Sequence, residues 1–221
     1  MSSSEAGSRR RARKRAADRS QPAPRDPDKV AQRRAELNPW LQRDLAAFEW
    51  INLKATHPLL DWVMARLTHF GLGGVQLLLI LAAAWFVRDW PGVRPLIVLC
   101  LYVFMTASFG ATWIKNRLKR RRPVYYTEAR LLVPRTEQGS FPSGHTCTSV
   151  AFAIAIGSQI PALLGPLLLF AALIGYSRIY VGLHFPGDVL GAIGLAMFSA
   201  GVVLGLAYFA GWLPLPPLTL G

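Results

Sequence analysis

Long runs without a formal charge constrain this 221-residue chain more than any other feature. They cover residues 67–87, 95–114, 138–177 and 189–221, and only 17% of the chain is charged, against about 25% in soluble proteins. A helix needs about 20 predominantly apolar residues to cross a bilayer. Because four such runs would leave too little polar surface to cover them in water, the sequence predicts an all-α integral membrane protein.

The third run is long enough for two short helices. Proline ends or kinks a helix, and both Pro161 and the Gly165-Pro166 pair interrupt this run. With one helix in each of the other runs, the sequence predicts a bundle of five transmembrane helices. The number is six if the segment that precedes residue 67 also crosses the membrane.

Segment 39–66 has a different pattern. Apolar residues recur at helical spacing, but six charged residues interrupt them too often for a typical span. Pro58 divides the segment, and Trp40 and Trp50 are side chains of the kind enriched at headgroup depth. We expect a broken amphipathic N-terminal helix that lies on the membrane interface. The alternative is a sixth, poorly hydrophobic helix packed inside the bundle.

The formal charge of +13 is concentrated in two places. Residues 1–38 contribute +6 and residues 115–139 contribute another +6. Residues 1–38 carry almost no large apolar side chains, so we expect a disordered basic tail that contacts anionic headgroups or only fixes orientation. Residues 39–221 then form one membrane-embedded domain. The partner that this arrangement predicts is the lipid bilayer, and not a nucleic acid.

The second basic cluster opens a motif in three parts. Its pattern is KxxxxxxRP, then PSGH, then SRxxxxxHxxxD. Its members are Lys115, Arg122, Pro123, Pro142, Ser143, Gly144, His145, Ser177, Arg178, His184 and Asp188.

The positive and small residues of this motif suit a bound phosphate. A phosphate monoester brings about two negative charges, and the transferred group spreads them over three oxygens. Lys115, Arg122 and Arg178 supply fixed positive charge, and the arginines add a fork geometry that matches phosphate. The Ser143 hydroxyl and the Gly144 backbone N–H can donate further hydrogen bonds. We predict that these five residues bind the phosphate of the substrate.

The remaining motif residues suit catalysis. A neutral imidazole can attack phosphorus if a carboxylate fixes its tautomer and orientation. His184 and Asp188, four residues apart near the start of the last helix, fit that role. A second histidine must protonate the leaving alkoxide, and His145 is the candidate.

With all eleven motif positions matched, the chain resembles the type 2 phosphatidic acid phosphatase family, whose site is shared with acid phosphatases and vanadium haloperoxidases. The resemblance covers residues 115–188, about a third of the chain. It implies that His184 forms a phosphohistidine oriented by Asp188. It further implies that His145 is the general acid that later activates water. A phosphatase domain over 39–221 and catalysis without a metal are also implied.

Several other polar residues are given simpler interpretations. Lys119, Arg120 and Arg121 lie between motif positions and are interpreted as headgroup contacts. His57 and His69 are interpreted as hydrogen-bonded polar groups, and Cys147 as a packing residue. Outside the tail only seven carboxylates exist, and none are clustered at metal-ligand spacing, so we expect no metal and no other cofactor.

These observations predict an integral membrane lipid phosphatase. The substrate classes that the resemblance implies are phosphatidic acid, phosphatidylglycerophosphate, polyprenyl diphosphates and lipid A phosphates. A lipid phosphotransferase that uses the same site is the alternative. A vanadate-dependent haloperoxidase and a non-enzymatic lipid-binding membrane protein fit less well, since the first is not expected to span a membrane and the second leaves the motif unexplained.

The location of the site along the membrane normal follows in part from the motif. His145 and His184 must meet on one side, so an even number of crossings separates them. If 39–66 lies flat, the basic tail and the site share one face, which the positive-inside rule makes cytoplasmic. If 39–66 crosses, as the usual six spans of the family imply, the site is extracytoplasmic. An alanine- and arginine-rich composition favours a multi-pass protein of a bacterial cell membrane.

Overall fold

The structure is a computed structural model that describes residues 27–86, 88–89, 92–134 and 139–212. Within these ranges all regular elements are helices and none is a strand, which confirms the predicted all-α class. Most of the predicted basic tail lies outside the described residues. Its last part is helical rather than irregular, because α2 (Pro27–Ala35) has Asp28 in its first turn and arginines in its last, where they match the helix dipole.

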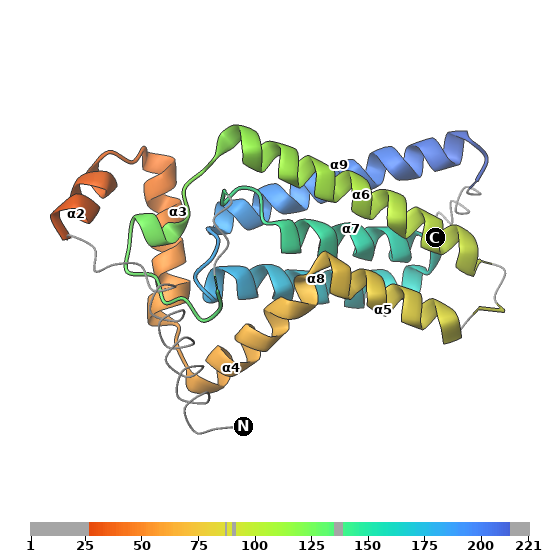
Figure 1. Ribbon diagram of the computed structural model, residues 1–221, viewed down its shortest axis with the longest axis horizontal. Helices are drawn as coiled ribbons and strands as arrows, with labels where there is room; N and C mark the ends of the chain where they lie inside the picture. The colour runs from red at the N-terminus through yellow and green to blue at the C-terminus, as the bar shows by residue number, and fades with distance from the viewer. Residues whose placement is uncertain (1–26, 87, 90–91, 135–138, 213–221) are drawn as a thin grey trace, which may run out of the picture.

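A bundle of long helices forms the body of the protein and runs along its longest axis (Figure 1). α7 lies inside this bundle and packs against α6, α8 and α9, while α5 contacts α6 and α7. The helices are α5 (Gly73–Phe86), α6 (Val93–Leu118), α7 (Gly144–Gln159), α8 (Pro161–Tyr180) and α9 (Pro186–Phe209).

Three helices of the described chain, α6, α8 and α9, are long and apolar enough to cross a membrane. A fourth crossing results if the segments Pro58–Gly71 and Gly73–Phe86, which meet at an angle of 72°, form one bent span. α7 has only 16 residues and falls short of the usual length. The structure therefore supports a helical membrane protein, while the count of five to six spans stays a prediction.

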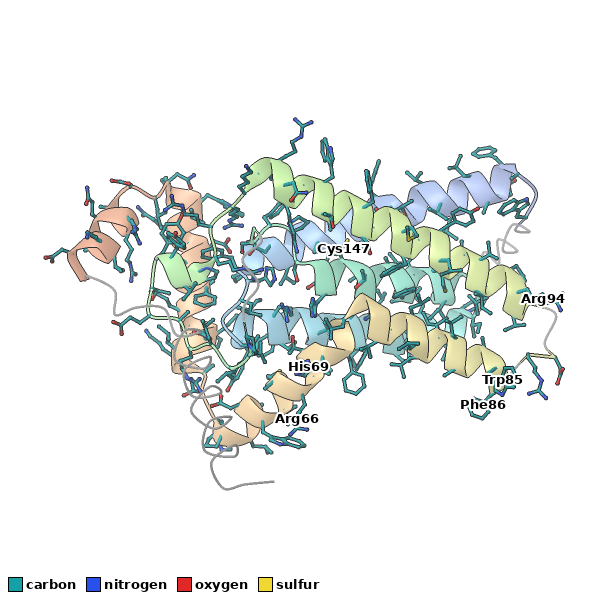
Figure 2. The ribbon with its side chains drawn as sticks, viewed as in Figure 1. Arg66, His69, Trp85, Phe86, Arg94 and Cys147 are labelled. Atoms are coloured by element: carbon teal, nitrogen blue, oxygen red, sulfur yellow. The ribbon has the colours of Figure 1, made fainter. Side chains whose placement is uncertain are left out.

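Small side chains line the contacts between these helices. Alanines of α6, α7 and α9 are buried in one core cluster, together with Leu99, Val103 and Phe152. Small residues let helix backbones approach closely, which matters in a membrane, where lipid tails compete with apolar packing. Cys147 is fully buried in this cluster, so its predicted packing role is confirmed (Figure 2).

The two proline breaks predicted within 138–177 have different outcomes. α7 ends at Gln159 and α8 begins at Pro161, as predicted. Pro166, however, lies inside α8, and the helix continues through it. The prediction of a break at Gly165-Pro166 is therefore wrong. The helix persists because each further backbone hydrogen bond that a break would open is costly in an apolar environment.

A segment before the bundle crosses one of its ends. α3 (Pro39–Glu49) runs across the bundle axis, and a π-helical turn (Trp50–Lys54) links it to the region of α4 (Pro58–Leu67) (Figure 1). The predicted division at Pro58 is confirmed. His57 caps α4, since its Nδ1 accepts a hydrogen bond from the Leu59 N–H at 3.2 Å, as expected for a polar residue at a helix end.

α3 is amphipathic in the way the sequence suggests. Leu45 and Phe48 are buried against Ile179 and Phe185, while the ring of Trp40 is 67% exposed. The buried face of α3 thus packs on the end of the bundle. Its position on the membrane interface stays a prediction.

The two ends of the bundle differ in character. The end covered by α3 holds the start of α7 and α9 and the last turns of α6 and α8 (Figure 1). Trp85, Phe86 and Arg94 lie at the opposite end (Figure 2). The histidines and cations of the motif therefore gather at the α3 end.

Candidate active site

The chain order brings the motif residues to one end of the bundle. Lys115 is in the last turn of α6, and Arg122 directly precedes the 3-10 turn η3 (Pro123–Tyr125). Ser143, Gly144 and His145 begin α7, and Arg178 is in the last turn of α8. His184 lies in the short α8–α9 connection, and Asp188 is in the first turn of α9.

His184 is held between a carboxylate and a guanidinium. Its side chain is 2% exposed, and its Nδ1 lies 3.5 Å from Asp188 Oδ2. Its Nε2 lies 3.5 Å from Arg122 Nη1. The first separation is longer than a normal hydrogen bond, and Nδ1 has no hydrogen-bond partner among the described residues. Catalytic hydrogen bonds are often long in an empty site and tighten when substrate binds.

The surroundings of His184 set its charge. Complete burial, opposed in part by the carboxylate of Asp188, lowers the pKa of His184 from 6.5 to about 3. The positive charges of Arg178 and Arg122 lower the pKa further. His184 is therefore neutral at physiological pH, with a free electron pair on the nitrogen that does not carry the proton.

Asp188 is fixed by several donors. The Phe185 backbone N–H donates to its Oδ2 at 2.9 Å, and the Ser140 hydroxyl donates to the same oxygen. Its other oxygen, Oδ1, accepts a hydrogen bond from Arg120 Nη1 at 2.7 Å. Because Asp188 is completely buried, these contacts hold one orientation of the carboxylate beside His184.

Three cations converge near the histidines. Arg122 is buried and donates from Nη1 to the Leu183 carbonyl at 2.7 Å. Arg178 is buried and donates from Nη1 to Thr68 Oγ1 at 2.7 Å, while its Nε has no partner among the described residues. Lys115 lies within electrostatic range of both arginines. A buried N–H without a partner is costly, so the arrangement favours an anion beside Arg178.

The start of α7 adds backbone donors to this cationic site. The side chain of Ser143, at the N-cap position, makes no capping bond within the described structure; its oxygen instead accepts a hydrogen bond from Thr146 Oγ1 at 2.9 Å. A Cβ on Gly144 would lie 3.4 Å from Lys115 Nζ, which shows how closely the lysine approaches this helix start. The N-terminus of a helix attracts anions through its free N–H groups and its dipole.

His145 is positioned by residues that the sequence analysis did not single out. A Cβ on Gly71 would lie 2.9 Å from His145 Cβ and Cδ2, so the imidazole packs directly on this glycine. The carbonyl of His145 accepts from Ser149 Oγ at 2.7 Å, and Gln76 Nε2 donates to the same hydroxyl at 2.6 Å. His145 is within electrostatic range of His184 and Arg178.

Arg120 corrects one interpretation made from the sequence. It was expected to contact headgroups, but its guanidinium points into the site and bridges two carboxylates. Besides Asp188 it binds Asp44 of α3, with Nη2 2.6 Å from Oδ2, and it lies over the ring of Phe185 at 4.5 Å. Asp44 also accepts from the Gly187 N–H at 2.8 Å. Arg120 thus connects α3 to the start of α9.

Further contacts fasten the α6–α7 loop to the same N-terminal segment. Thr127 Oγ1 donates to Glu49 Oε1 at 2.6 Å. The Arg130 N–H donates to Asn52 Oδ1 at 2.8 Å, and the Arg130 guanidinium pairs with Asp61. The segment from α3 to α4 therefore holds the loop that carries Arg120 and Arg122 in place.

The fold and this site together define a helical membrane protein with a cationic, histidine-containing site at one end of its bundle. Residues 95–212, more than half of the chain, match the model of the PAP2 superfamily. The chain therefore belongs to the PAP2 superfamily, and it is a membrane phosphatase. This match confirms the resemblance inferred from the motif.

Individual relatives agree with this assignment. The chain is 31% identical to the undecaprenyl-diphosphatase BcrC of Bacillus subtilis over 153 residues, which cover 68% of this chain and 74% of BcrC. The structure resembles a transmembrane PAP2 type phosphatidylglycerolphosphate phosphatase from Bacillus subtilis, with a TM-score of 0.65 and 27% identity, over 81% of this chain and 90% of that one. Aquifex aeolicus LpxE gives a TM-score of 0.63 and 29% identity, over 73% and 94% of the two chains.

Proposed function

We propose that this protein is a metal-independent lipid phosphatase that works through a phosphohistidine on His184. The observation that carries the proposal is the convergence of three cations on two histidines at one end of the bundle, with Arg178 Nε and His184 Nδ1 left without partners among the described residues. A phosphate at this position would meet positive charge, backbone donors at the start of α7 and a neutral imidazole.

In the first step the neutral His184 attacks phosphorus with Nε2. The P–O bond to the leaving group breaks as the N–P bond forms. His145, which is protonated once the negative phosphate lies beside it, gives its proton to the leaving oxygen. Asp188 stabilises the positive charge that develops on His184 by drawing Nδ1–H towards Oδ2 across the present 3.5 Å. Lys115, Arg122 and Arg178 stabilise the equatorial oxygens of the transferred group.

In the second step water hydrolyses the phosphohistidine. His145, now neutral, accepts a proton from the water as its oxygen attacks phosphorus. The N–P bond breaks, inorganic phosphate is released, and His184 returns to its neutral form. No metal is needed in either step, because the protein supplies its own positive charge. The carboxylates of Asp44 and Asp188 are already paired with Arg120.

The substrate class follows from the position of the site and from the relatives. A cationic pocket at the end of a membrane bundle suits an amphiphile with an anionic headgroup. The names of the relatives refer to undecaprenyl diphosphate and phosphatidylglycerophosphate. We therefore propose that the substrate is a lipid with a phosphate monoester or diphosphate headgroup, of the phosphatidic acid, phosphatidylglycerophosphate or polyprenyl diphosphate class.

The proposed domain crosses the membrane at least five times. α7 connects the two ends of the bundle although it is short, and it is surrounded by α6, α8 and α9. A short helix shielded from lipid in this way does not need a full hydrophobic length. With α7 counted beside α6, α8, α9 and the bent α4–α5 pair, five spans result.

The function is tested by phosphate release from the detergent-solubilised protein in the presence of EDTA. The substrates are phosphatidic acid, phosphatidylglycerophosphate, a polyprenyl diphosphate and a water-soluble phosphate ester. We expect release from at least one lipid, unaffected by EDTA and abolished by His184→Ala. His57→Ala is the matched control, since His57 caps α4 outside the pocket, and it should retain activity.

Two results would contradict the proposal. Loss of activity in EDTA, restored by a divalent cation, would show that a metal takes part. Unchanged release by a folded His184→Ala variant would show that another group attacks phosphorus.

A further inference from the structure

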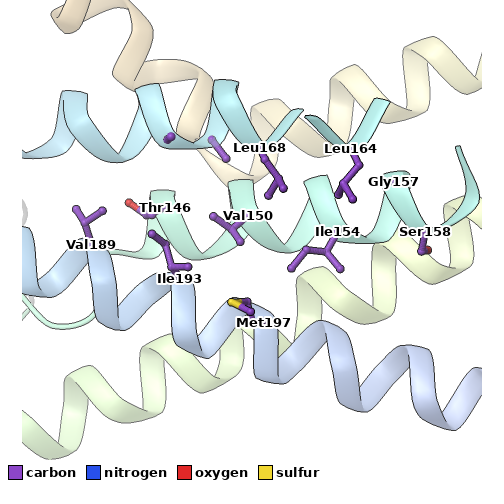
Figure 3. A pocket seen from close by; sticks show the side chains of 12 residues that line it. Thr146, Val150, Ile154, Gly157, Ser158, Leu164, Leu168, Val189, Ile193 and Met197 are labelled. Atoms are coloured by element: carbon purple, nitrogen blue, oxygen red, sulfur yellow. The ribbon is translucent and has the colours of Figure 1, made fainter. Parts of the chain in front are cut away.

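An apolar cavity of about 490 Å³ runs between α7, α8 and α9 (Figure 3). Its walls include Val150 and Ile154 of α7, Leu168 of α8, and Ile193 and Met197 of α9. Hydroxyl side chains line it only at its two ends, among the residues that the structure describes. One is at the first turn of α7 and the other at the last.

The first of these ends adjoins the candidate active site. Thr146 directly follows His145, and its hydroxyl donates a hydrogen bond to Ser143 Oγ at 2.9 Å. Val189, which lines the same end of the cavity, directly follows Asp188. The apolar cavity therefore ends one hydrogen bond away from a residue of the proposed phosphate pocket.

The cavity is long enough to hold a hydrocarbon chain through the whole of one leaflet. It extends along α7 from Thr146 to Ser158, twelve residues further on. This distance is about 18 Å at 1.5 Å per residue. Half of the hydrocarbon core of a bilayer is about 15 Å thick. A hydrocarbon chain that starts at the pocket and follows α7 would thus find apolar walls through its own leaflet.

We propose that this cavity binds one hydrocarbon chain of the lipid whose phosphate occupies the pocket. The proposal rests on the proposed function, and it adds a chain-binding site that selects long-chain substrates. The occupant is the substrate rather than bulk lipid, because the cationic pocket at the Thr146 end favours a chain that carries an anionic phosphate.

A second apolar cavity provides a matched control. It measures about 760 Å³ and lies between α6 and α9, lined by Val98, Tyr102 and Leu206 among others. These residues belong to the start of α6 and the end of α9, at the end of the bundle opposite the pocket. Filling it should leave substrate selection unchanged.

The test compares two cavity-filling variants. Ala172 lines the first cavity and is exposed, so Ala172→Phe fills it without disturbing the packed core. Ala207→Phe fills the second cavity. For each, kcat/KM is measured in mixed micelles on a short-chain and a long-chain form of the lipid in the panel above that the wild-type protein hydrolyses. We expect Ala172→Phe to lower kcat/KM on the long chain about tenfold, because the added ring and the bound chain would overfill the cavity, and to leave kcat/KM on the short chain unchanged.

The remaining outcomes are also decisive. Equal losses on both substrates in a folded Ala172→Phe protein, or equal effects of Ala172→Phe and Ala207→Phe, would overturn the chain-binding site. If Ala172→Phe does not fold, the smaller Ala172→Leu replaces it, and an unchanged preference for the long chain would again refute the proposal. Absence of hydrolysis by the wild-type protein on every lipid named for the proposed function would instead contradict that function.

Discussion

Removal of the Arg120 guanidinium should disable the site without removing any motif residue. In Arg120→Gln the carboxylates of Asp188 and Asp44 lose the cation that lies 2.7 and 2.6 Å from them. Asp188 is completely buried and 5% of the Asp44 side chain is exposed, so neither charge gains much solvation in return. Arg120 is therefore a positioning residue that acts through Asp188 on His184.

The size of the effect follows from the burial of the pair. Breaking a buried ion pair by removing one partner costs about 3–5 kcal/mol. The Arg120 side chain is 21% exposed, so the lower limit of about 3 kcal/mol applies. If this cost falls on the orientation of Asp188, kcat drops about 100-fold. Arg120→Lys keeps the positive charge but cannot bridge both carboxylates, so its kcat should be about tenfold lower than that of the wild type.

The assay is phosphate release over a range of substrate concentrations, so that kcat and KM separate. A positioning role predicts a change in kcat with little change in KM. Asp44→Asn should recover part of the loss in the Arg120→Gln background, because it removes one of the two unpaired charges. Arg117→Gln is the control, since Arg117 is exposed and stacks on Trp113.

A folded Arg120→Gln protein with kcat within about threefold of the wild type would refute this reasoning. So would a rise in KM at constant kcat, which would make Arg120 a direct phosphate ligand.

Three further outcomes follow from the packing of the site. Burial lowers the pKa of His184 from 6.5 to about 3, so between these pH values the unfolded chain binds more protons than the folded protein. The stability of the folded protein should therefore fall as the pH decreases through this window. Thermal unfolding of His184→Asn should depend less on pH. Gly71→Ala would place a Cβ 2.9 Å from His145 and should lower kcat about tenfold. Gly74→Ala is the control, because a Cβ there has nothing within 4 Å, and it should leave kcat unchanged. Equal kcat values for the two variants would contradict a positioning role of Gly71 beside His145. Thr68→Val removes the hydroxyl that accepts a hydrogen bond from the buried Arg178 guanidinium at 2.7 Å. This change should lower kcat/KM about tenfold, which steady-state kinetics will measure.

Much of the bundle could be predicted because charge is costly in a membrane. The uncharged runs located α6, α8 and α9, and the prolines at 58 and 161 marked helix starts, where a missing N–H costs nothing. The same rule failed at Pro166, because an apolar environment keeps the helix intact around a proline. Sequence spacing alone does not distinguish these cases.

The motif predicted which residues gather, and the structure brings them together, but their catalytic roles stay predictions. The sequence analysis missed Arg120, because a basic stretch does not show which side chain turns inward. One signal was present. Asp44 shares the helical face of Leu41, Leu45 and Phe48, and a carboxylate on a buried face needs a cation. The identity of that cation depends on how α3 crosses the bundle, which no local pattern encodes.

Phosphoryl transfer to His184 during turnover is the step on which the proposed mechanism depends. It is tested most directly by rapid quenching of a His145→Ala variant with a labelled phosphate ester whose leaving group needs no protonation. Without His145 the intermediate should form and persist, because nothing activates the water. We expect acid-labile, base-stable phosphate on His184, located by peptide mass spectrometry and absent when His184 is also changed to alanine. Turnover by the wild-type protein with no label on His184 in either protein would contradict it.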